Sequence, residues 1–178
     1  MKKPAFHLFA VVLAAACGVA SLPAFSQSAA PNDAQIAGIV VAANTVDIDA
    51  GKLAKAKASK KDVKDFAKQM VTDHTGVNKQ ATALVTKLKV KPEESDISKS
   101  LKDGGAANIA KLKGLKGEAF DKAYVDNEVT YHQAVLDAID KTLIPSAKNE
   151  ELKGLLQKVR PVIDAHLQHA KQIQSSLK

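Results

Sequence analysis

The amino-acid sequence predicts an all-α protein, a four-helix bundle in which one connection is a long crossover. Three observations lead to this prediction. Apolar residues recur at steps of three and four over four long stretches. The alternation of apolar and polar residues that is typical of strands is almost absent, and no hairpin dipeptide joins two apolar runs. A length of 178 residues favours a single domain.

The N-terminal residues have the pattern of an export signal. Lys2 and Lys3 precede an apolar run over residues 5–20, and residues 24–26, Ala-Phe-Ser, form a small-x-small cleavage site. The apolar run is too short to span a membrane, and no later segment reaches that length. Residues 1–26 are therefore predicted to be a secretory signal peptide, which places the mature protein in the periplasm or outside the cell.

A second N-terminal pattern leaves an alternative open. Residues 14–17, Ala-Ala-Ala-Cys, resemble a lipoprotein box, and lipidation of Cys17 would anchor the protein to the outer membrane. Cleavage after residue 26 would instead leave a mature chain without cysteine, and so without disulfides. Residues 27–31 are a Ser/Ala/Pro leader that we predict to be disordered, and residues 32–178 form the predicted bundle domain.

The charge of the chain excludes one class of partner. The full sequence has 26 basic and 19 acidic residues. Without Lys2 and Lys3, 24 basic residues remain against 19 acidic ones, a net charge of +5. Lysine supplies nearly all of this charge, because Arg160 is the only arginine, and aromatic residues are few. We therefore expect no nucleic-acid partner, and at most contact with anionic envelope surfaces through lysine-rich faces.

The first predicted helix covers residues 32–58. Asn32 or Asp33 can cap it directly after Pro31. Its apolar seam is interrupted by one carboxylate, and the seam consists of Ile36, Val40, Ala43, Asp47, Ala50 and Ala54.

The second predicted helix covers residues 59–90. Ser59 followed by Asp62 is a capping-box-like start, so the link to the first helix must be tight, and Pro92 follows its end. Its seam carries an imidazole where a leucine would be expected, and the seam consists of Val63, Ala67, Met70, His74, Val77, Ala81, Leu84 and Leu88.

Residues 93–117 form the predicted crossover between the second and third long helices. Residues 93–96, Glu-Glu-Ser-Asp, have the composition of a helix start, but Gly104 and Gly105 follow within ten residues. We predict one or two short helical pieces here, broken at this glycine pair.

The last two long helices are predicted at residues 118–144 and 149–177. Pro145 is expected to end the first of them, and Pro161 is expected to kink the second one. The apolar face of the first comprises Phe120, Tyr124, Val125, Tyr131, Val135, Leu136, Ile139 and Leu143, and the seam of the second comprises Leu152, Leu155, Val159, Val162, His166, Ala170, Ile173 and Leu177. Two short links and one long one are the ferritin-like connection pattern.

Each predicted helix carries one ionisable residue on its inward face: Asp47, His74, His132 and His166. A rise of about 1.5 Å per residue places all four near the middle of the bundle. Three imidazoles and a carboxylate can hold a transition-metal ion such as zinc, copper, iron or manganese.

Other polar residues lie close to these four in the sequence. Glu128 and His169 share helix faces with His132 and His166 and could join or support the site. Asp73 is rotated by about 100° from its neighbour His74, so we expect it not to belong to the same site.

The same residues have an interpretation without a metal. Asp47 and His74 could form one buried pair, and Tyr131 could bond His166, because buried polar groups need partners and can find them in one another. The protein would then be a structural or interaction protein of the cell envelope. The sequence gives no positive case for an enzyme, since it has no Ser/His/Asp set, no Gly-rich phosphate loop and no evident nucleophile in the mature chain.

Three segments resemble a family of exported bacterial proteins known only as a domain of unknown function, whose members are often labelled outer membrane proteins. They are DIDAGKLAKAKASKKDVKDFAKQMVTDHT at residues 47–75, GEAFDKAYVDNEVTYHQAVL at 117–136 and VRPVIDAHLQHA at 159–170. The resemblance implies a ferritin-like fold and identifies His74, His132 and His166 with the histidines of the family motifs. Asp47 stands where relatives usually have Glu, so its side chain reaches less far.

The pattern differs from that of di-iron proteins of the ferritin-like fold. Those proteins use Glu-x-x-His pairs, whereas Val71, Val129 and Ile163 stand three residues before the three histidines. If an ion binds, the sequence therefore favours a single, histidine-rich site.

Overall fold

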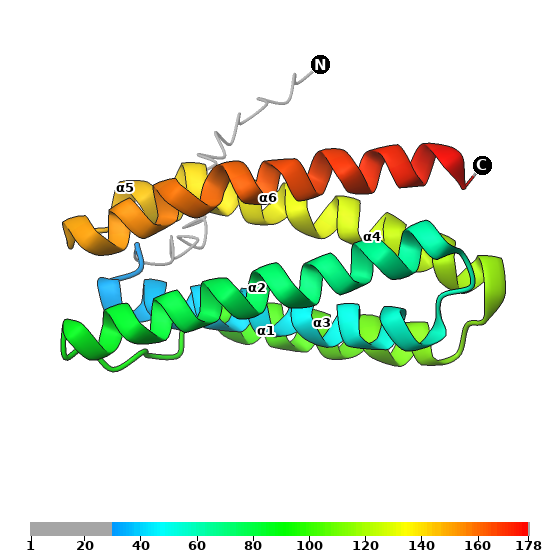
Figure 1. The fold of residues 1–178 in the computed structure, drawn as a ribbon. Coiled ribbons are helices and arrows are strands. Elements are labelled where there is room, and N and C mark those ends of the chain that lie inside the picture. The colour runs from blue at the N-terminus through cyan, green and yellow to red at the C-terminus, as the bar shows by residue number, and fades with distance from the viewer. Residues whose placement is uncertain (1–29, 178) are drawn as a thin grey trace, which may run out of the picture.

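The structure is a computed structural model that describes residues 30–177. Over this range the chain is helical and has no strand, which confirms the all-α prediction (Figure 1). The predicted signal peptide and Cys17 lie outside the described residues, as does most of the predicted leader. The elements are α1 (Asp33–Lys57), α2 (Lys61–Lys87), α3 (Asp96–Lys113), α4 (Gly117–Ala138), the π-helix η1 (Ile139–Leu143), α5 (Ile144–Ser146) and α6 (Glu150–Ser176).

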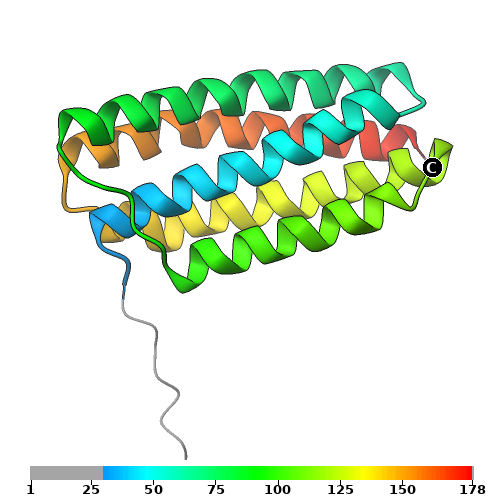
Figure 2. The ribbon, with the colours of Figure 1, turned by 90° about the horizontal axis from the view of Figure 1, so that it is seen from below.

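The long helices form two hairpins that pack into one bundle (Figures 1 and 2). α1 packs chiefly against α2, and α4 packs chiefly against α6. Further contacts between α2 and α6 and between α1 and α4 close the bundle around a common core. The connection from α2 to α4 carries α3, which packs along α1. Between residues 30 and 177, none of the helices is long and apolar enough to cross a bilayer.

The crossover is more ordered than the sequence analysis predicted. α3 is one helix of 18 residues that contains both Gly104 and Gly105, so the predicted break is wrong. Ser95 caps it in a capping box with Ser98. A Cβ atom at position 105 would lie 2.8 Å from the side chain of Val46 on α1, whereas one at position 104 would meet nothing. Gly105 therefore permits the close approach of α3 to α1.

The helix starts depend on both local and distant caps. Asn32 caps α1 in a capping box with Gln35, as predicted. The predicted cap of α2 by Ser59 is wrong, because the fully buried carboxylate of Asp121 on α4 accepts hydrogen bonds from the Ser59 N–H and hydroxyl and from the Lys60 N–H. A cap supplied from another helix ties the first hairpin to the second one.

The two inner prolines do not end their helices. The helix that contains α4 continues through η1 and α5, so Pro145 lies inside it. Proline has no N–H to donate, and the wider π-turn accommodates this defect, with the Ile144 N–H donating to the Ile139 carbonyl. α6 likewise runs unbroken through Pro161.

The core has two apolar halves with a polar layer between them. One half lies around Ile36 and Leu156, and the other lies around Phe66 and Tyr124. The buried face of α6 differs in detail from the predicted seam, since it contains Leu156 and Ile163 in place of Leu155 and Val162. The polar layer is formed by Asp47, His74, Glu128, His132 and His166, all at most 4 % exposed.

Candidate metal centre

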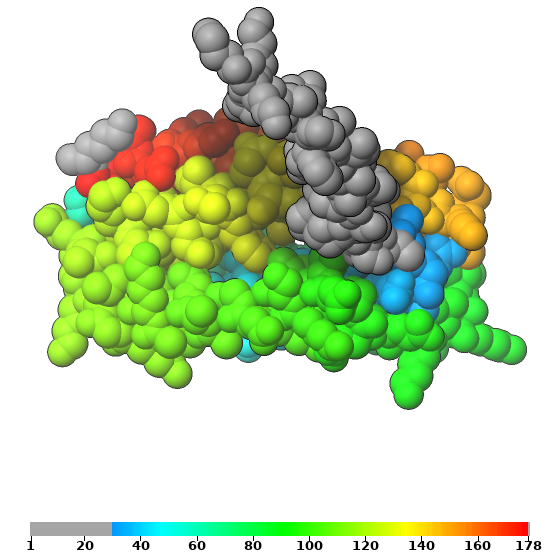
Figure 3. Space-filling model, turned by 180° about the vertical axis from the view of Figure 1, so that it is seen from behind, coloured from blue at the N-terminus to red at the C-terminus, as the bar shows by residue number. Residues whose placement is uncertain are grey.

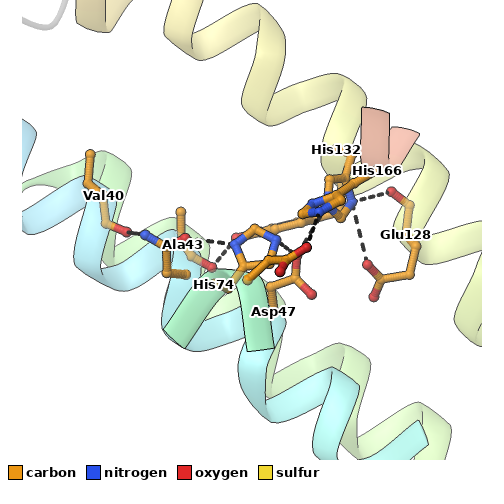
Figure 4. Close-up of polar contacts among 10 residues, drawn as sticks. Val40, Ala43, Asp47, His74, Glu128, His132 and His166 are labelled. Carbon is orange, nitrogen blue, oxygen red and sulfur yellow. Dashed lines mark hydrogen bonds and ion pairs between the residues drawn. The ribbon is translucent and has the colours of Figure 1, made fainter. Parts of the chain in front are cut away.

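The four long helices place Asp47, His74, His132 and His166 together at the middle of the bundle (Figure 4). We call these four residues the polar cluster. The three imidazole centroids lie 5.3 to 5.7 Å apart. One ring nitrogen from each histidine falls within 4.8 Å of the other two. The seam histidines of three helices thus converge on one point, as the sequence analysis expected.

His74 is oriented by Asn44, one turn from Asp47 on α1. The Asn44 side-chain amide donates to the Val40 carbonyl at 2.8 Å, so its Oδ1 is free to accept. His74 Nδ1 lies 2.7 Å from that oxygen and therefore carries the proton. In the neutral ring, Nε2 then presents a lone pair toward Asp47 Oδ2, only 2.9 Å away.

His132 is oriented by the backbone of its own helix. Its Nδ1 lies 3.0 Å from the Glu128 carbonyl, which can only accept, so Nδ1 donates. Nε2 lies 3.4 Å from Asp47 Oδ2 and again faces it with a lone pair. Burial, together with the charges of His74 and His166, lowers the pKa of His132 to about 4, so the ring is neutral at pH 7.

His166 is oriented by Asp73, a residue that we expected to lie outside the site. His166 Nε2 lies 3.0 Å from the Asp73 carboxylate, which lies at the surface between α2 and α6. Asp73 is in neither group of converging ligand atoms, but α6 packs beside α2 and brings the outer nitrogen of His166 within reach of it. Nδ1 of His166 remains buried without a hydrogen-bond partner among the described residues. Burial lowers the pKa of His166 as well, against the opposing attraction of Asp73.

Asp47 is the anionic member of the polar cluster. Burial alone would raise its pKa, but the attraction of His74, His132 and His166 holds it below the ordinary value of 3.8. Within residues 30–177, neither carboxylate oxygen has a hydrogen-bond partner of acceptable geometry. A buried carboxylate without donors is costly, so this position requires a positive charge or a proton.

Glu128 lies beside the polar cluster, fully buried on α4. Burial, followed by the charge of Asp47, raises its pKa well above the ordinary value. Its Oε2 lies 3.4 Å from His132 Nδ1 and has no hydrogen-bond partner in the described chain. Asp47, Glu128 and His132 form a second group whose ligand atoms lie within 4.8 Å of one another.

Two residues considered in the sequence analysis lie away from this point. His169, which we expected to support the site, bonds Gln69 at 3.2 Å near the surface and packs edge-on against Phe66. The Tyr131 hydroxyl donates to the Ala43 carbonyl at 2.9 Å and does not bond His166.

The residues present fit a transition-metal ion. Each imidazole donates one N–H to an outer acceptor, an amide, a carbonyl or a carboxylate, and turns its other nitrogen inward. Metal-binding histidines are held in this way, because the outer bond fixes the tautomer and the ring orientation. The inward nitrogens of His74, His132 and His166 and both oxygens of Asp47 lack partners of acceptable geometry among the described residues.

Comparison with protein families gives a match to the family described as "Domain of unknown function (DUF4142)", over residues 19–173. The chain belongs to this family. The resemblance to a family of unknown function is thereby confirmed, and the whole polar cluster falls within the matched range. Searches of curated proteins and of solved structures found no match.

Sequence reasoning missed two residues of this DUF4142 chain, Asn44 and Asp73. Asn44 could have been found, because it precedes Asp47 by three residues and so shares its helix face. Asp73 could not be assigned from α2 alone, because its partner lies on α6.

Proposed function

We propose that this protein binds one transition-metal ion in the core of its helical bundle, with Asp47, His74, His132 and His166 as ligands. The observation that supports this is the direction of the imidazole nitrogens. Each ring gives its N–H to an outer acceptor, so the lone pairs and the Asp47 carboxylate face one another. Such groups repel one another unless a cation lies among them.

The donor set indicates the class of ion. Imidazole nitrogen suits zinc, copper and iron, and a carboxylate suits manganese and iron as well. Magnesium and calcium prefer shells made of oxygen, which this cluster does not offer. We therefore propose zinc, copper, iron or manganese, and we propose Glu128 as a residue that supports or joins the ligands.

The proposed place of action is the periplasm. Support comes from the export signal pattern of residues 1–26, with lipidation of Cys17 and an outer-membrane anchor as the alternative. Lysine-rich helix faces would favour contact with anionic envelope surfaces.

We also infer that the bundle is ferritin-like in its connections. Two hairpins, α1–α2 and α4–α6, are joined by a single long crossover, which is the pattern of that fold. Its site would differ from the di-iron type, because no Glu-x-x-His pair is present at the three histidines.

The second candidate function is that of a structural or interaction protein of the envelope with an ion-free polar core. The 2.9 Å distance between His74 Nε2 and Asp47 Oδ2 favours it, since a proton there would make an ion pair. That proton would still leave the inward nitrogens of His132 and His166 without donors among the described residues. For this reason we prefer the metal-binding function.

Elemental analysis of the untagged protein, purified from the periplasm, tests this choice. We expect about one ion per chain in the wild type and none in the His74→Ala/His132→Ala variant. His169→Ala is the matched control, because it removes a histidine outside the polar cluster and should keep its ion. No metal in the wild type, with silent zinc and copper titrations, would contradict the proposal and leave the ion-free core.

A further inference from the structure

An apolar cavity of about 120 Å³ adjoins the polar cluster. Its inner wall includes Asn44, Asp47, His74 and His132, so three of the four proposed ligands border it. Its other walls are almost wholly aliphatic and come from α1, α2, α3, α4, η1 and α6. The cavity thus connects the candidate metal centre to the apolar half of the core.

The outer side of the cavity lies between α3 and α4. Ile97 and Leu101 of α3 and Val135 and Ala138 of α4 all line the cavity, and all four side chains are half-buried. α3 and α4 contact each other only sparsely, and both lie on the face shown in Figure 3. A small molecule could therefore enter between these two helices and reach the polar cluster.

The lining decides what can occupy this space. A buried water needs two to four polar partners, which only the inner wall offers, because the other walls are almost wholly aliphatic. Dry cavities of about 150 Å³ with similar linings bind benzene or xenon. The π-helix η1 contributes Ile139 and Leu143 to the wall, and π-turns occur frequently at functional sites.

We propose that this cavity binds a small uncharged apolar molecule, of about the size of a benzene ring with at most one small substituent, and holds it beside the metal ion. The inference rests on the proposed metal-binding function for the ion, but the binding of the apolar molecule can be measured separately. The cavity thereby gives the metal centre a substrate class, small molecules that prefer an apolar environment to water.

Fluorobenzene is the probe, observed by ¹⁹F NMR. Binding is measured with zinc-loaded protein, and the manganese-loaded protein then reports proximity, because a paramagnetic ion speeds relaxation of a nearby fluorine. Ala138→Leu adds bulk at the cavity mouth, and Leu101→Phe narrows it from α3. Ala119→Leu is the matched control, since Ala119 is an exposed residue of α4 that does not line the cavity.

We expect the wild type and Ala119→Leu to bind fluorobenzene, and both mouth variants to bind it at least tenfold more weakly with unchanged metal content. In the manganese-loaded wild type, the ¹⁹F relaxation of bound fluorobenzene should be faster than in the zinc-loaded protein. No binding to the wild type would overturn the inference whatever its metal content. Binding in a protein that holds no metal would support the cavity and contradict the proposed metal-binding function, so the two failures are distinguishable.

Discussion

Asn44 contacts no proposed ion, yet it fixes the tautomer of one proposed ligand. Asn44→Leu removes the oxygen that accepts the His74 Nδ1 proton, so His74 can rotate or protonate its inner nitrogen. We expect the affinity for the metal to fall about 10- to 100-fold, the usual cost of losing such an outer partner. Competition with a chelator of known affinity measures the change.

A neighbouring residue provides the control for Asn44→Leu. Thr45→Val alters an exposed side chain that bonds only within α1 and with Asn78, and it should leave the affinity unchanged. Equal affinities for Asn44→Leu and the wild type would show that the outer hydrogen bond does not hold His74 as a ligand.

Asp47 is expected to favour metal binding at the expense of stability. Asp47→Asn replaces a buried anion with an amide whose N–H groups can donate to the inward nitrogens of His74 and His132. The variant should lose the ion, and its metal-free form should be as stable as the wild type or up to about 2 kcal/mol more stable. Urea unfolding in the presence of a chelator gives the comparison, and a large loss of stability would contradict it.

The metal-free protein should lose stability in mild acid. Burial lowers the pKa of His132 from its ordinary value of 6.5 to about 4 in the folded state. Between these two pH values the unfolded chain therefore binds a proton at His132 that the folded chain does not bind. The free energy of unfolding therefore falls as the pH falls from 6.5 to 4, by on the order of 3 kcal/mol. The lowered pKa of His166 acts in the same direction.

Urea unfolding between pH 8 and pH 4 in a chelator tests this dependence. His132→Leu should show a much weaker slope, because it removes the imidazole whose pKa burial lowers to about 4. A wild-type stability that is flat over this range would mean that the core histidines are not buried in their neutral form.

At the scale of elements, the two adjacent glycines of α3 should respond in opposite ways to alanine. Gly104→Ala adds a methyl group to open space and should stabilise the helix by up to about 1 kcal/mol. Gly105→Ala brings the same gain in helix propensity, but its methyl group would clash with the side chain of Val46. Overpacking of this kind costs about 1 to 3 kcal/mol of stability. Thermal unfolding should place Gly105→Ala well below Gly104→Ala, and equal stabilities would refute the close packing of α3 on α1.

The elements show what periodicity could predict. The four long helices were predicted because each repeats apolar residues over many turns, and burial of those residues outweighs local defects such as Pro145 and Pro161. α3 was not predicted as one helix because a glycine pair usually breaks helices. The reason for a glycine at position 105 is the side chain of Val46 on α1, which the sequence of α3 does not reveal. The cap of α2 was missed because Asp121 lies some 60 residues away.

The candidate site was predictable to a similar extent. Seam position was enough to bring the three histidines and Asp47 together, because side chains at one level of a bundle converge. The outer partner Asp73 and the outward position of His169 depend on how α2 and α6 are rotated against each other. The apolar pattern of a single helix does not reveal how that helix is rotated against its neighbours. The buried face of α6 shows the same limit, because it contains Leu156 where the pattern predicted Leu155.

For the whole molecule, the ion should act as a stabilising ligand of the folded state. The polar cluster takes one residue from each long helix, so the complete set of donors exists only in the folded chain. An ion at 100 times its dissociation constant should then add about 2.7 kcal/mol to the free energy of unfolding. Calorimetry with and without a chelator should show a higher melting temperature for the loaded protein.

The His74→Ala/His132→Ala variant and His169→Ala serve as the two controls. The melting temperature of the His74→Ala/His132→Ala variant should not change with added ion or chelator. The melting temperature of His169→Ala should change as that of the wild type does. A response of the double variant equal to that of the wild type would place the ion elsewhere in the protein.

The donors of the polar cluster are divided evenly between the two hairpins. Asp47 and His74 belong to α1 and α2, while His132 and His166 belong to α4 and α6. Either hairpin alone offers an ion only two of the four proposed donors, so it should bind the ion only weakly. If the ion binds as proposed, we expect its capture to be a late step in refolding, so that the rate of ion uptake reports the docking of one hairpin onto the other.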